Sequence, residues 1–387
     1  MACQATSTAA APFAFQRVVA VVRAANDAAA RRRVLSALPP AAAAEAGRGD
    51  RLLVLAGDVA RPRLGLSAAA YGRLVREATL VVHAAALVKH WPLRDLVPLL
   101  DANAGAAVRV ASLAAHAAAL RRRRQHANAQ PAPALPRVVY VSTATCFHDD
   151  LENTHRCVRR LSDAPRALTA FGGYGAAKYL GELAFVAAAR RCGFPLLVTR
   201  PCLLTWATTR ADGGAPRVVA TNTDDWFVRL VDSVVAMRVR PWLHPGDDVA
   251  NRAPTTTPVD ACAARIVARA FEFFATAVPA ASGAPAGICA PVHAPFDDSQ
   301  PPVRMGDLLA AAFPPSFAMA VPPFAFCAAA RRVVPPPPFF PLLHMFSAGD
   351  AAAKSNAVSA DPSSPAVPPH ARPLVAAMRA YAGVDRR

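Results

Sequence analysis

The chain has 387 residues, of which 54% are hydrophobic and 18% are charged, so it is long enough to bury a large core. Its formal net charge is +17, but the basic residues are mostly arginines scattered through alanine-rich segments, and no nucleic-acid-binding motif accompanies them. This pattern argues against a nucleic-acid partner. The eight cysteines form no C-x-x-C pair and none has zinc-ligand spacing beside a histidine, so we expect no metal site and free thiols in a reducing compartment.

No uninterrupted apolar run reaches the ~18 residues that a membrane helix needs, so no membrane span is expected. The first residues are poor in acidic side chains, as transit peptides are, although the sequence from Arg17 onward already has the pattern of a folded domain. We therefore expect a cytoplasmic protein, with a plastid as the alternative location.

Short runs rich in β-branched residues predict strands, and the stretches of helix formers between them predict helices. The predicted strands span 17–23, 51–58, 79–86, 136–145 and 194–201. The predicted helices span 24–38, 67–78, 99–124, 174–192, 224–237 and 259–277. Ser67 is the expected cap of the second helix, and Asp27 either caps the first or lies in its first turn. Strands that alternate with helices predict βαβ units, and hence a doubly wound parallel sheet with helices on both faces.

The regular alternation ends near residue 202, which divides the chain into four predicted parts. Residues 1–16 are expected to be unstructured, and residues 17–201 form an α/β core. Residues 202–277 are expected to supply a smaller substrate lid whose helices pack on that core. Residues 278–387 are dense in proline, including four consecutive prolines at 335–338, so they are expected to form an irregular tail.

Tyr174 and Lys178 are four residues apart on a predicted helix, so the phenol and the ammonium lie on one face. This arrangement suits carbonyl reduction, because the phenol can donate a proton to the oxygen while hydride reaches the carbon. The nearby ammonium would lower the phenol pKa toward the working range. The spacing alone is common on amphipathic helices, and other residues must support the interpretation.

Thr143 follows the predicted strand at 136–145, at the end where open α/β sheets bind their ligands. A hydroxyl at this position can hold the substrate oxygen beside the phenol. Ser142 is the alternative residue for this role. Both hydroxyls also fit an ordinary polar strand end.

Together, Ser142-Thr143, the run from Gly173 to Lys178 and Glu182 resemble the extended short-chain dehydrogenase/reductase family, whose core is Rossmann-like. More narrowly, the chain resembles the thioester reductase branch. That branch includes the terminal reductase domains of carboxylic acid reductases, aminoadipate reductases and nonribosomal peptide synthetases, and it is related to fatty acyl-CoA reductases. Five further segments carry this narrower resemblance: VVAVVRA (18–24), GDVARPRLGLS (57–67), VVHAAALV (81–88), TNTDDWFVRL (221–230) and Pro258-Val259-Asp260.

The resemblance implies roles for individual residues. Thr143, Tyr174 and Lys178 would be the catalytic residues, and Lys178 would also hold the nicotinamide ribose. The remaining cofactor residues would lie along the NADPH site: Arg23 at the 2′-phosphate, Arg33 as a second phosphate candidate, Asp58 near the adenine, Ala84 and Ala85 as a backbone wall, Asn103 holding a bend or water near Lys178, and Pro201. A guanidinium is a natural bidentate partner of a phosphate, which favours NADPH over NADH.

One departure from the family concerns its first strand and the glycine-rich turn, G-x-x-G-x-x-G, that cradles the pyrophosphate. Sixteen residues precede Arg17 and none is glycine, whereas a βαβ unit takes ~30 residues. The missing strand is the central one, so the sheet should be incomplete between the strands at 17–23 and 79–86. The chain is then a fragment of a working enzyme or a degenerate relative. A third interpretation makes 17–23 the first strand. A smaller departure is Cys202, where the family has glycine.

The sequence therefore predicts NADPH-dependent reduction of an acyl thioester to an aldehyde, and in a second step to an alcohol. The acyl partner would be carried on a phosphopantetheine carrier protein or on coenzyme A. One alternative is a sugar-nucleotide epimerase or dehydratase, or a steroid-type dehydrogenase, of the same extended family. Another is a non-catalytic pseudoenzyme that binds no NADPH.

Overall fold

A computed structural model describes the following residues: 16–38, 40–88, 96–127, 134–143, 146, 164–201, 204–205, 207–209, 217–220, 225–242, 257–276, 305–333, 335 and 372–384. The chain divides into two compact units. The first contains Met1–Arg200 and Ala264–Ala294, and the second contains Pro201–Ala263 and Pro295–Arg387.

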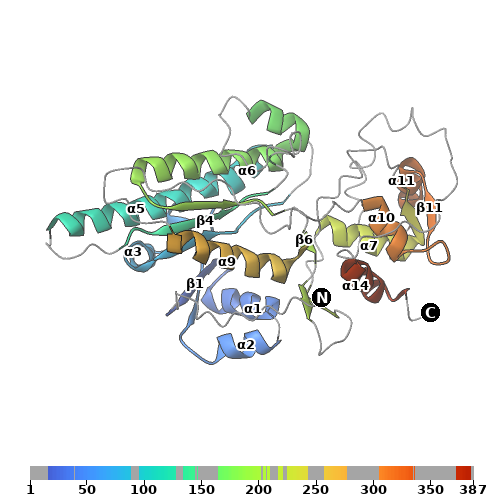
Figure 1. Ribbon diagram of the computed structural model, residues 1–387, viewed down its shortest axis with the longest axis horizontal. Coiled ribbons are helices and arrows are strands. Elements are labelled where there is room, and N and C mark those ends of the chain that lie inside the picture. Colours follow the sequence, from blue (N-terminus) through green and yellow to red (C-terminus); the bar gives the residue numbers. More distant parts are fainter. Residues whose placement is uncertain are drawn as a thin grey trace. The chain divides into compact units, whose positions relative to one another are not determined.

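The first unit is a layered α/β structure (Figure 1). Its strands are β1 (Val18–Val22), β2 (Leu52–Ala56), β3 (Leu80–His83), β4 (Arg137–Val141) and β5 (Leu196–Thr199). Its helices are α1 (Asp27–Ala37), α2 (Pro40–Gly47), η1 (Pro62–Gly65), α3 (Ala68–Glu77), α4 (Leu96–Leu99), η3 (Leu100–Gly105), α5 (Ala106–Ala127), α6 (Ala164–Cys192) and, from Ala264 onward, α9 (Val259–Thr276). The five strands and the helices between them confirm the predicted alternation.

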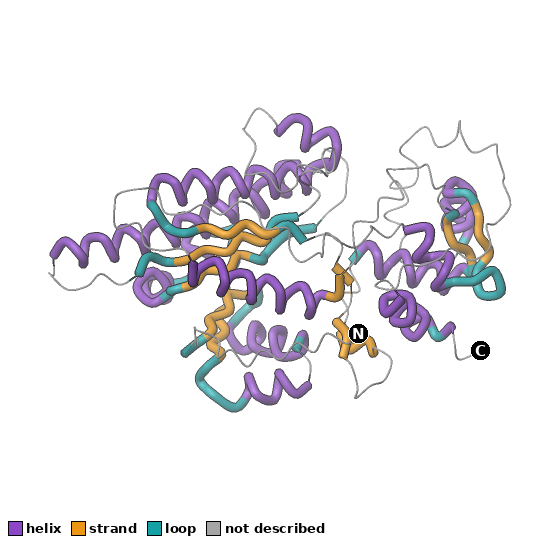
Figure 2. The backbone as a smooth tube through the Cα atoms, in the orientation of Figure 1, coloured by secondary structure: helices purple, strands orange, loops and turns teal. Residues whose placement is uncertain are grey.

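The strands form two separate parallel sheets (Figure 2). β1 pairs with β2, and β3, β4 and β5 form a second sheet with β4 at its centre. Among the described strands, β1 and β3 are not paired with each other. The parallel sheet and its interruption between these two strands were both expected from the sequence.

Helices cover both faces of the three-stranded sheet. On one face, α3, α5 and α6 pack their apolar side chains against β3, β4 and β5, in a core that includes Val81, Val138 and Leu196. On the other face, α9 packs Ala270 and Phe274 on β4 and β5. Side chains alternate between the two faces along each strand, which is why consecutive β4 residues belong to different clusters.

Local capping fixes where the first helices begin. The side chain of Asn26 accepts a hydrogen bond from the backbone of Ala29 and caps α1. Asp27 lies in the first turn, and its carboxylate accepts a hydrogen bond from the Ala56 backbone at 2.6 Å. Ser67 caps α3 as expected, accepting from Ala70. Asn26 was the better cap because its own backbone is extended, whereas Asp27 is already helical.

The longest apolar helical stretch runs from Leu96 to Gln125 and contains a π-helical segment, η3. Among the described residues it is the one helix long and apolar enough to cross a membrane. The sequence predicts no membrane span here, because Asp101 and Arg109 interrupt the apolar run. Its alanines Ala107, Ala114 and Ala118 are buried against the three-stranded sheet and its helices.

The second unit has its own hydrophobic core, built around Phe227, Leu309, Phe313 and Phe326. Its elements are β6 (Leu204–Thr205), β7 (Ala207–Thr209), β8 (Arg217–Ala220), α7 (Trp226–Met237), β9 (Val239–Pro241), β10 (Thr257–Pro258), α10 (Met305–Ala312), β11 (Met319–Val321), α11 (Pro323–Arg332) and α14 (Arg372–Ala382).

The expectation of an irregular tail after residue 277 was wrong for its described part. This part contains α10, β11, α11 and α14, and β11 pairs in parallel with β9. The proline content misled the prediction, because proline at the first turn of a helix is tolerated, as at Pro323 in α11.

Candidate functional site

The end of β4 and the middle of α6 bring the predicted catalytic residues into one neighbourhood. Thr143 is buried two residues beyond β4, while Tyr174 is half-buried and Lys178 is buried on α6. The Cys146 thiol connects the two elements, since it donates to the Gly175 carbonyl at 3.5 Å and lies 3.6 Å from the Ser142 hydroxyl. The roles of Thr143 and Tyr174 remain predictions.

Lys178 is turned toward the end of β4. Its Nζ donates to the Val141 carbonyl at 2.7 Å and lies 4.5 Å from the centroid of the Tyr140 ring. Burial lowers the pKa of this ammonium to about 8, while Cys146 and Glu182 act in the opposite direction. The helix therefore delivers a positive charge to the strand end at which Thr143 lies.

Two buried features near Lys178 were not assigned from the sequence. Glu182 and Arg200 form a fully buried, bidentate ion pair, with hydrogen bonds of 2.8 and 2.6 Å, which joins α6 to the end of β5. Glu182 belongs to the family motif, and Arg200 lies directly before Pro201. A search for opposite charges near the predicted site could therefore have found this pair. Burial, and after it the negative charge of Glu182, raises the pKa of the Cys146 thiol to about 12, so the thiol stays protonated. No sequence pattern marks this residue.

His83, at the end of β3, is a third buried feature that was not assigned from the sequence. It is buried, its ring stacks on Tyr140 with centroids 5.6 Å apart, and its Nε2 has no hydrogen-bond partner. Burial, together with the charge of Lys178, lowers the pKa of His83 to about 3, so the ring is neutral. In the sequence, only its place in the VVHAAALV motif marks this histidine.

The predicted cofactor residues lie beyond the carboxyl ends of successive strands. Arg23 follows β1, Asp58 follows β2, and Ala84-Ala85 follow β3. Pro201 follows β5 and is buried. The strands within each sheet are parallel, so these ends gather at one edge of their sheet, as a nucleotide site requires. They are nevertheless divided between two sheets.

The described contacts show what several of these residues do. Arg23 is exposed, and Arg33 donates to the Arg23 carbonyl at 2.9 Å, so Arg33 braces the turn after β1. One Asp58 carboxylate oxygen accepts from the Ala60 backbone at 2.9 Å. Asn103, in η3, binds both the N–H and the carbonyl of Leu87, at 2.8 and 2.9 Å, and thereby holds the segment that follows β3.

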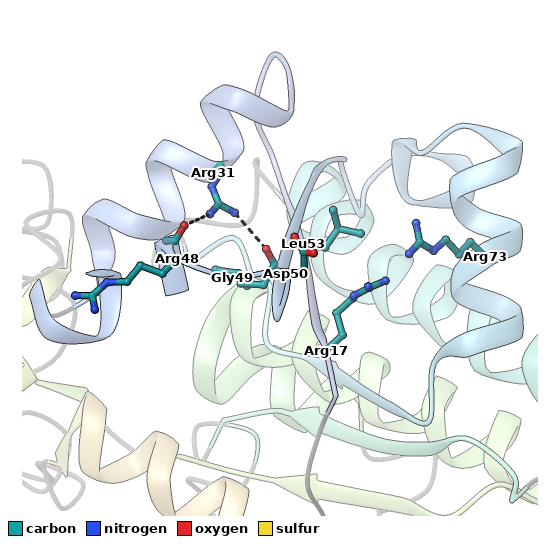
Figure 3. A pocket seen from close by; sticks show the side chains of 9 residues that line it. Arg17, Arg31, Arg48, Gly49, Asp50, Leu53 and Arg73 are labelled. Atoms are coloured by element: carbon teal, nitrogen blue, oxygen red, sulfur yellow. Dashed lines mark hydrogen bonds between the residues drawn. The ribbon is translucent and has the colours of Figure 1, made fainter. Parts of the chain in front are cut away.

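A cavity of about 470 Å³ lies away from these residues (Figure 3). Arg17, Arg31, Arg48 and Arg73 line it together with Leu52 and Leu53, which begin β2. Arg31 is fixed by the Leu52 and Gly47 carbonyls. Because Arg17 precedes β1 and Leu52 begins β2, this cavity opens at the amino ends of the strands, opposite to the edge that carries Arg23 and Asp58.

Comparisons with known proteins identify relatives of the chain. The family model NAD_binding_4, described as "Male sterility protein", matches residues 11–266. Isonitrile lipopeptide synthase of Mycobacterium tuberculosis is 29% identical over 286 residues, which are 67% of this chain and 10% of that protein. Peramine synthetase A of Epichloe festucae is 29% identical over 229 residues, which are 58% of this chain and 7% of that protein. The chain thus spans a tenth or less of these curated relatives.

Solved structures share the fold over nearly the whole chain. The reductase domain of a nonribosomal peptide synthetase from Mycobacterium tuberculosis superposes with a TM-score of 0.61 at 22% identity, covering 95% of this chain and 85% of that one. The terminal R domain of the myxalamid pathway gives a TM-score of 0.56 at 20% identity, covering 96% and 84%. A thiolation-reductase di-domain from an archaeal nonribosomal peptide synthetase gives 0.55 at 13% identity, covering 96% and 70%.

The family match spans more than half of the chain, and the likeness to reductase domains agrees with the motifs read from the sequence. The chain belongs to the NAD-binding family described as male sterility protein.

Proposed function

We propose that this chain reduces acyl thioesters with NADPH as the reductant. The observation that carries the proposal is the position of Lys178, whose ammonium is held at the end of β4 by the Val141 carbonyl. This places a positive charge on the same helix face as the Tyr174 phenol, one turn away, and near the strand end that bears Thr143. Relatives that are nonribosomal peptide synthetase reductase domains support the same chemistry.

The residues present fit one part of NADPH. The exposed Arg23 guanidinium, braced by Arg33, is a suitable partner for a 2′-phosphate and favours NADPH over NADH. The small, exposed Ala84 and Ala85 leave room for a ligand beside the β3 end. The segment between β1 and α1, residues 23–26, contains no glycine and does not offer a pyrophosphate cradle. Bound NADPH would supply the hydride.

In the proposed reaction, the Thr143 and Tyr174 hydroxyls hydrogen-bond the thioester oxygen and stabilise the negative charge that develops there when hydride adds to the carbonyl carbon. The Lys178 ammonium stabilises the phenolate that forms when Tyr174 gives up its proton, and this proton passes to the sulfur as the C–S bond breaks. Breakage of the C–S bond then releases an aldehyde and a thiol. The acyl carrier is a phosphopantetheine arm on a carrier protein, a choice that the thiolation-reductase relative supports.

The test follows NADPH oxidation by absorbance with an acyl group loaded on a carrier protein, on coenzyme A, or with UDP-sugars in place of the thioester. We expect oxidation with the carrier-bound thioester, and a fall of about 10²–10⁴-fold in kcat for Tyr174→Phe. Tyr71→Phe, which removes a phenol hydroxyl on α3, is the matched control and should retain full activity. Oxidation with UDP-sugars alone would overturn the thioester assignment.

A non-catalytic role is the second candidate, because the β1–β2 and β3–β4–β5 sheets are separate in the structure. A fluorescence titration with NADPH distinguishes the two. Saturable binding that weakens in Arg23→Gln supports the enzyme, whereas no binding at millimolar NADPH, with the protein folded, supports the non-catalytic role.

A further inference from the structure

Tyr140 occupies the centre of the buried cluster beside Lys178. It lies on β4, is fully buried, and contacts aromatic rings from two other elements: His83 of β3, and Phe185 of α6 at a centroid distance of 4.7 Å. The Lys178 ammonium lies 4.5 Å from the centroid of the same ring, within the range of a cation–π interaction. The ring is thus one of the groups that compensate a charge removed from water.

The Tyr140 hydroxyl contacts Lys178 a second time, through the backbone. It donates to the Lys178 carbonyl at 3.2 Å, and because burial raises the Tyr140 pKa well above its ordinary value, it stays a neutral donor. The same side chain therefore holds both the backbone and the ammonium of Lys178.

Gly181 shows that α6 is adapted to this hydroxyl. Glycine is unfavourable inside a helix, so its presence there calls for a packing reason. A Cβ at Gly181 would collide with the Tyr140 hydroxyl oxygen, and it would also crowd Ala107 of α5 at 3.1 Å. The glycine allows the phenol to reach the helix backbone one turn from Tyr174.

The other polar groups around Lys178 do not fix the direction of its ammonium, whereas the Tyr140 ring does. Cys146 and Glu182 face the ammonium electrostatically, but Glu182 is already paired with Arg200, and Cys146 is a protonated thiol. His83 is neutral. The Val141 carbonyl and the Tyr140 ring contact the ammonium directly and fix its direction.

We propose that Tyr140 is the positioning residue of Lys178, holding the ammonium with its ring and the helix backbone with its hydroxyl. The inference rests on the proposed function in that it explains how the reductase orients its lysine. It goes beyond that function by assigning a role to a fully buried residue of β4.

The chain has only three lysines, Lys89, Lys178 and Lys354, so the signals of the Lys178 side chain can be resolved from the others. The experiment labels lysine with ¹³C and records the Cε–Hε signals of the full-length protein. Protons over the face of an aromatic ring are shielded, so one of three signals should be displaced upfield, and Lys178→Arg should remove that signal. Tyr140→Leu should abolish the displacement, and Tyr140→Phe, which keeps the ring, should retain most of it.

Gly181→Ala provides a second variant that leaves Tyr140 in place, and it should move the displaced signal because the new methyl pushes on the phenol. Gly72→Ala on α3 is its matched control, since the nearest atom to its new methyl is the end of the flexible Arg76 side chain, at 3.3 Å. Tyr71→Phe is the control for Tyr140→Phe. Both controls should leave all three signals unchanged.

A wild-type spectrum with no displaced lysine signal overturns the proposal, as does a displaced signal that persists unchanged in folded Tyr140→Leu or Gly181→Ala. These outcomes do not depend on turnover, so they differ from a failure of the proposed function, which appears as absence of NADPH oxidation or binding. Where wild-type turnover is observed, Tyr140→Leu should lower kcat at least tenfold with the thioester KM unchanged, as expected for a residue that acts through Lys178.

Discussion

The two sheets of the first unit contain strands of nearly the same sequence in different environments. β1 reads VVAVV and β4 reads RVVYV, yet Val18 is 54% exposed, whereas Val138, Val139 and Tyr140 are completely buried. β4 pairs on both sides and is covered by α6 on one face and α9 on the other, while β1 pairs with β2 alone. The burial of a strand is therefore decided by its neighbours, and β-propensity alone does not distinguish these two.

The largest loss of stability should come from breaking the buried Glu182–Arg200 ion pair, which joins α6 to the end of β5. Arg200→Met leaves the buried Glu182 carboxylate without its partner, and we expect the free energy of unfolding to fall by about 3–5 kcal/mol. Chemical denaturation measures this loss. Arg269→Gln breaks an exposed pair with Glu272 and should cost about 0–1 kcal/mol. Equal losses in the two variants would show that the buried pair does not stabilise this sheet.

A pair of leucine truncations compares the two sheets directly. Leu197→Ala in β5 empties a fully buried site and should cost about 2–5 kcal/mol, whereas Leu53→Ala in β2 is half-buried and should cost less than that range. Urea unfolding curves with a common slope provide both values. A larger loss for Leu53→Ala would mean that the β1–β2 sheet is as well packed as its neighbour, contrary to the structure.

Acid should destabilise the three-stranded sheet through His83. Its pKa is about 3 in the folded protein, whereas the ordinary pKa of histidine is 6.5. Below pH 6.5, His83 therefore binds a proton in the unfolded chain but stays neutral in the native protein. Stability is therefore lost as the pH falls from 6.5 toward 3, by about 2 kcal/mol between pH 7 and pH 5. His83→Phe should remove this part of the pH dependence, while His116→Gln, on the exposed side of α5, should follow the wild-type curve.

The smallest loss of stability should come from removing helix caps, and it tests whether the two sheets unfold together. Asn26→Ala removes the cap of α1, beside β1, and Ser67→Ala removes the cap of α3; each should cost about 1 kcal/mol. Amide exchange monitored by mass spectrometry shows where the loss is felt. We expect Asn26→Ala to speed exchange mainly in β1 and β2, because α1 packs on β2 and its Asp27 accepts a hydrogen bond from Ala56 at the end of that strand. Uniform acceleration across β4 as well would indicate a single cooperative unit.

Much of the site could be predicted because it depends on order along the chain. Arg23, Asp58 and Thr143 each follow a β-branched run, so their places beyond the carboxyl ends of strands followed from the sequence, although these strands belong to two sheets. The position of Lys178 on α6 followed from its spacing of four residues from Tyr174 on a predicted helix. Tyr140 was missed because nothing in a valine-rich strand marks its hydroxyl as a partner for a helix carbonyl, and that contact arises only when α6 packs on β4.

By itself, the sequence determined the alternation of strands and helices, the Ser67 cap of α3, the family, and the break in the sheet before β3, because each of these depends on residues close together in the chain. The tertiary structure decided which strand is central, the helices and the strand in the proline-rich region, and the direction in which Lys178 points. Those features depend on contacts between residues distant in sequence, such as Tyr140 with Lys178 and Glu182 with Arg200, whose strength comes from burial that only the folded chain creates.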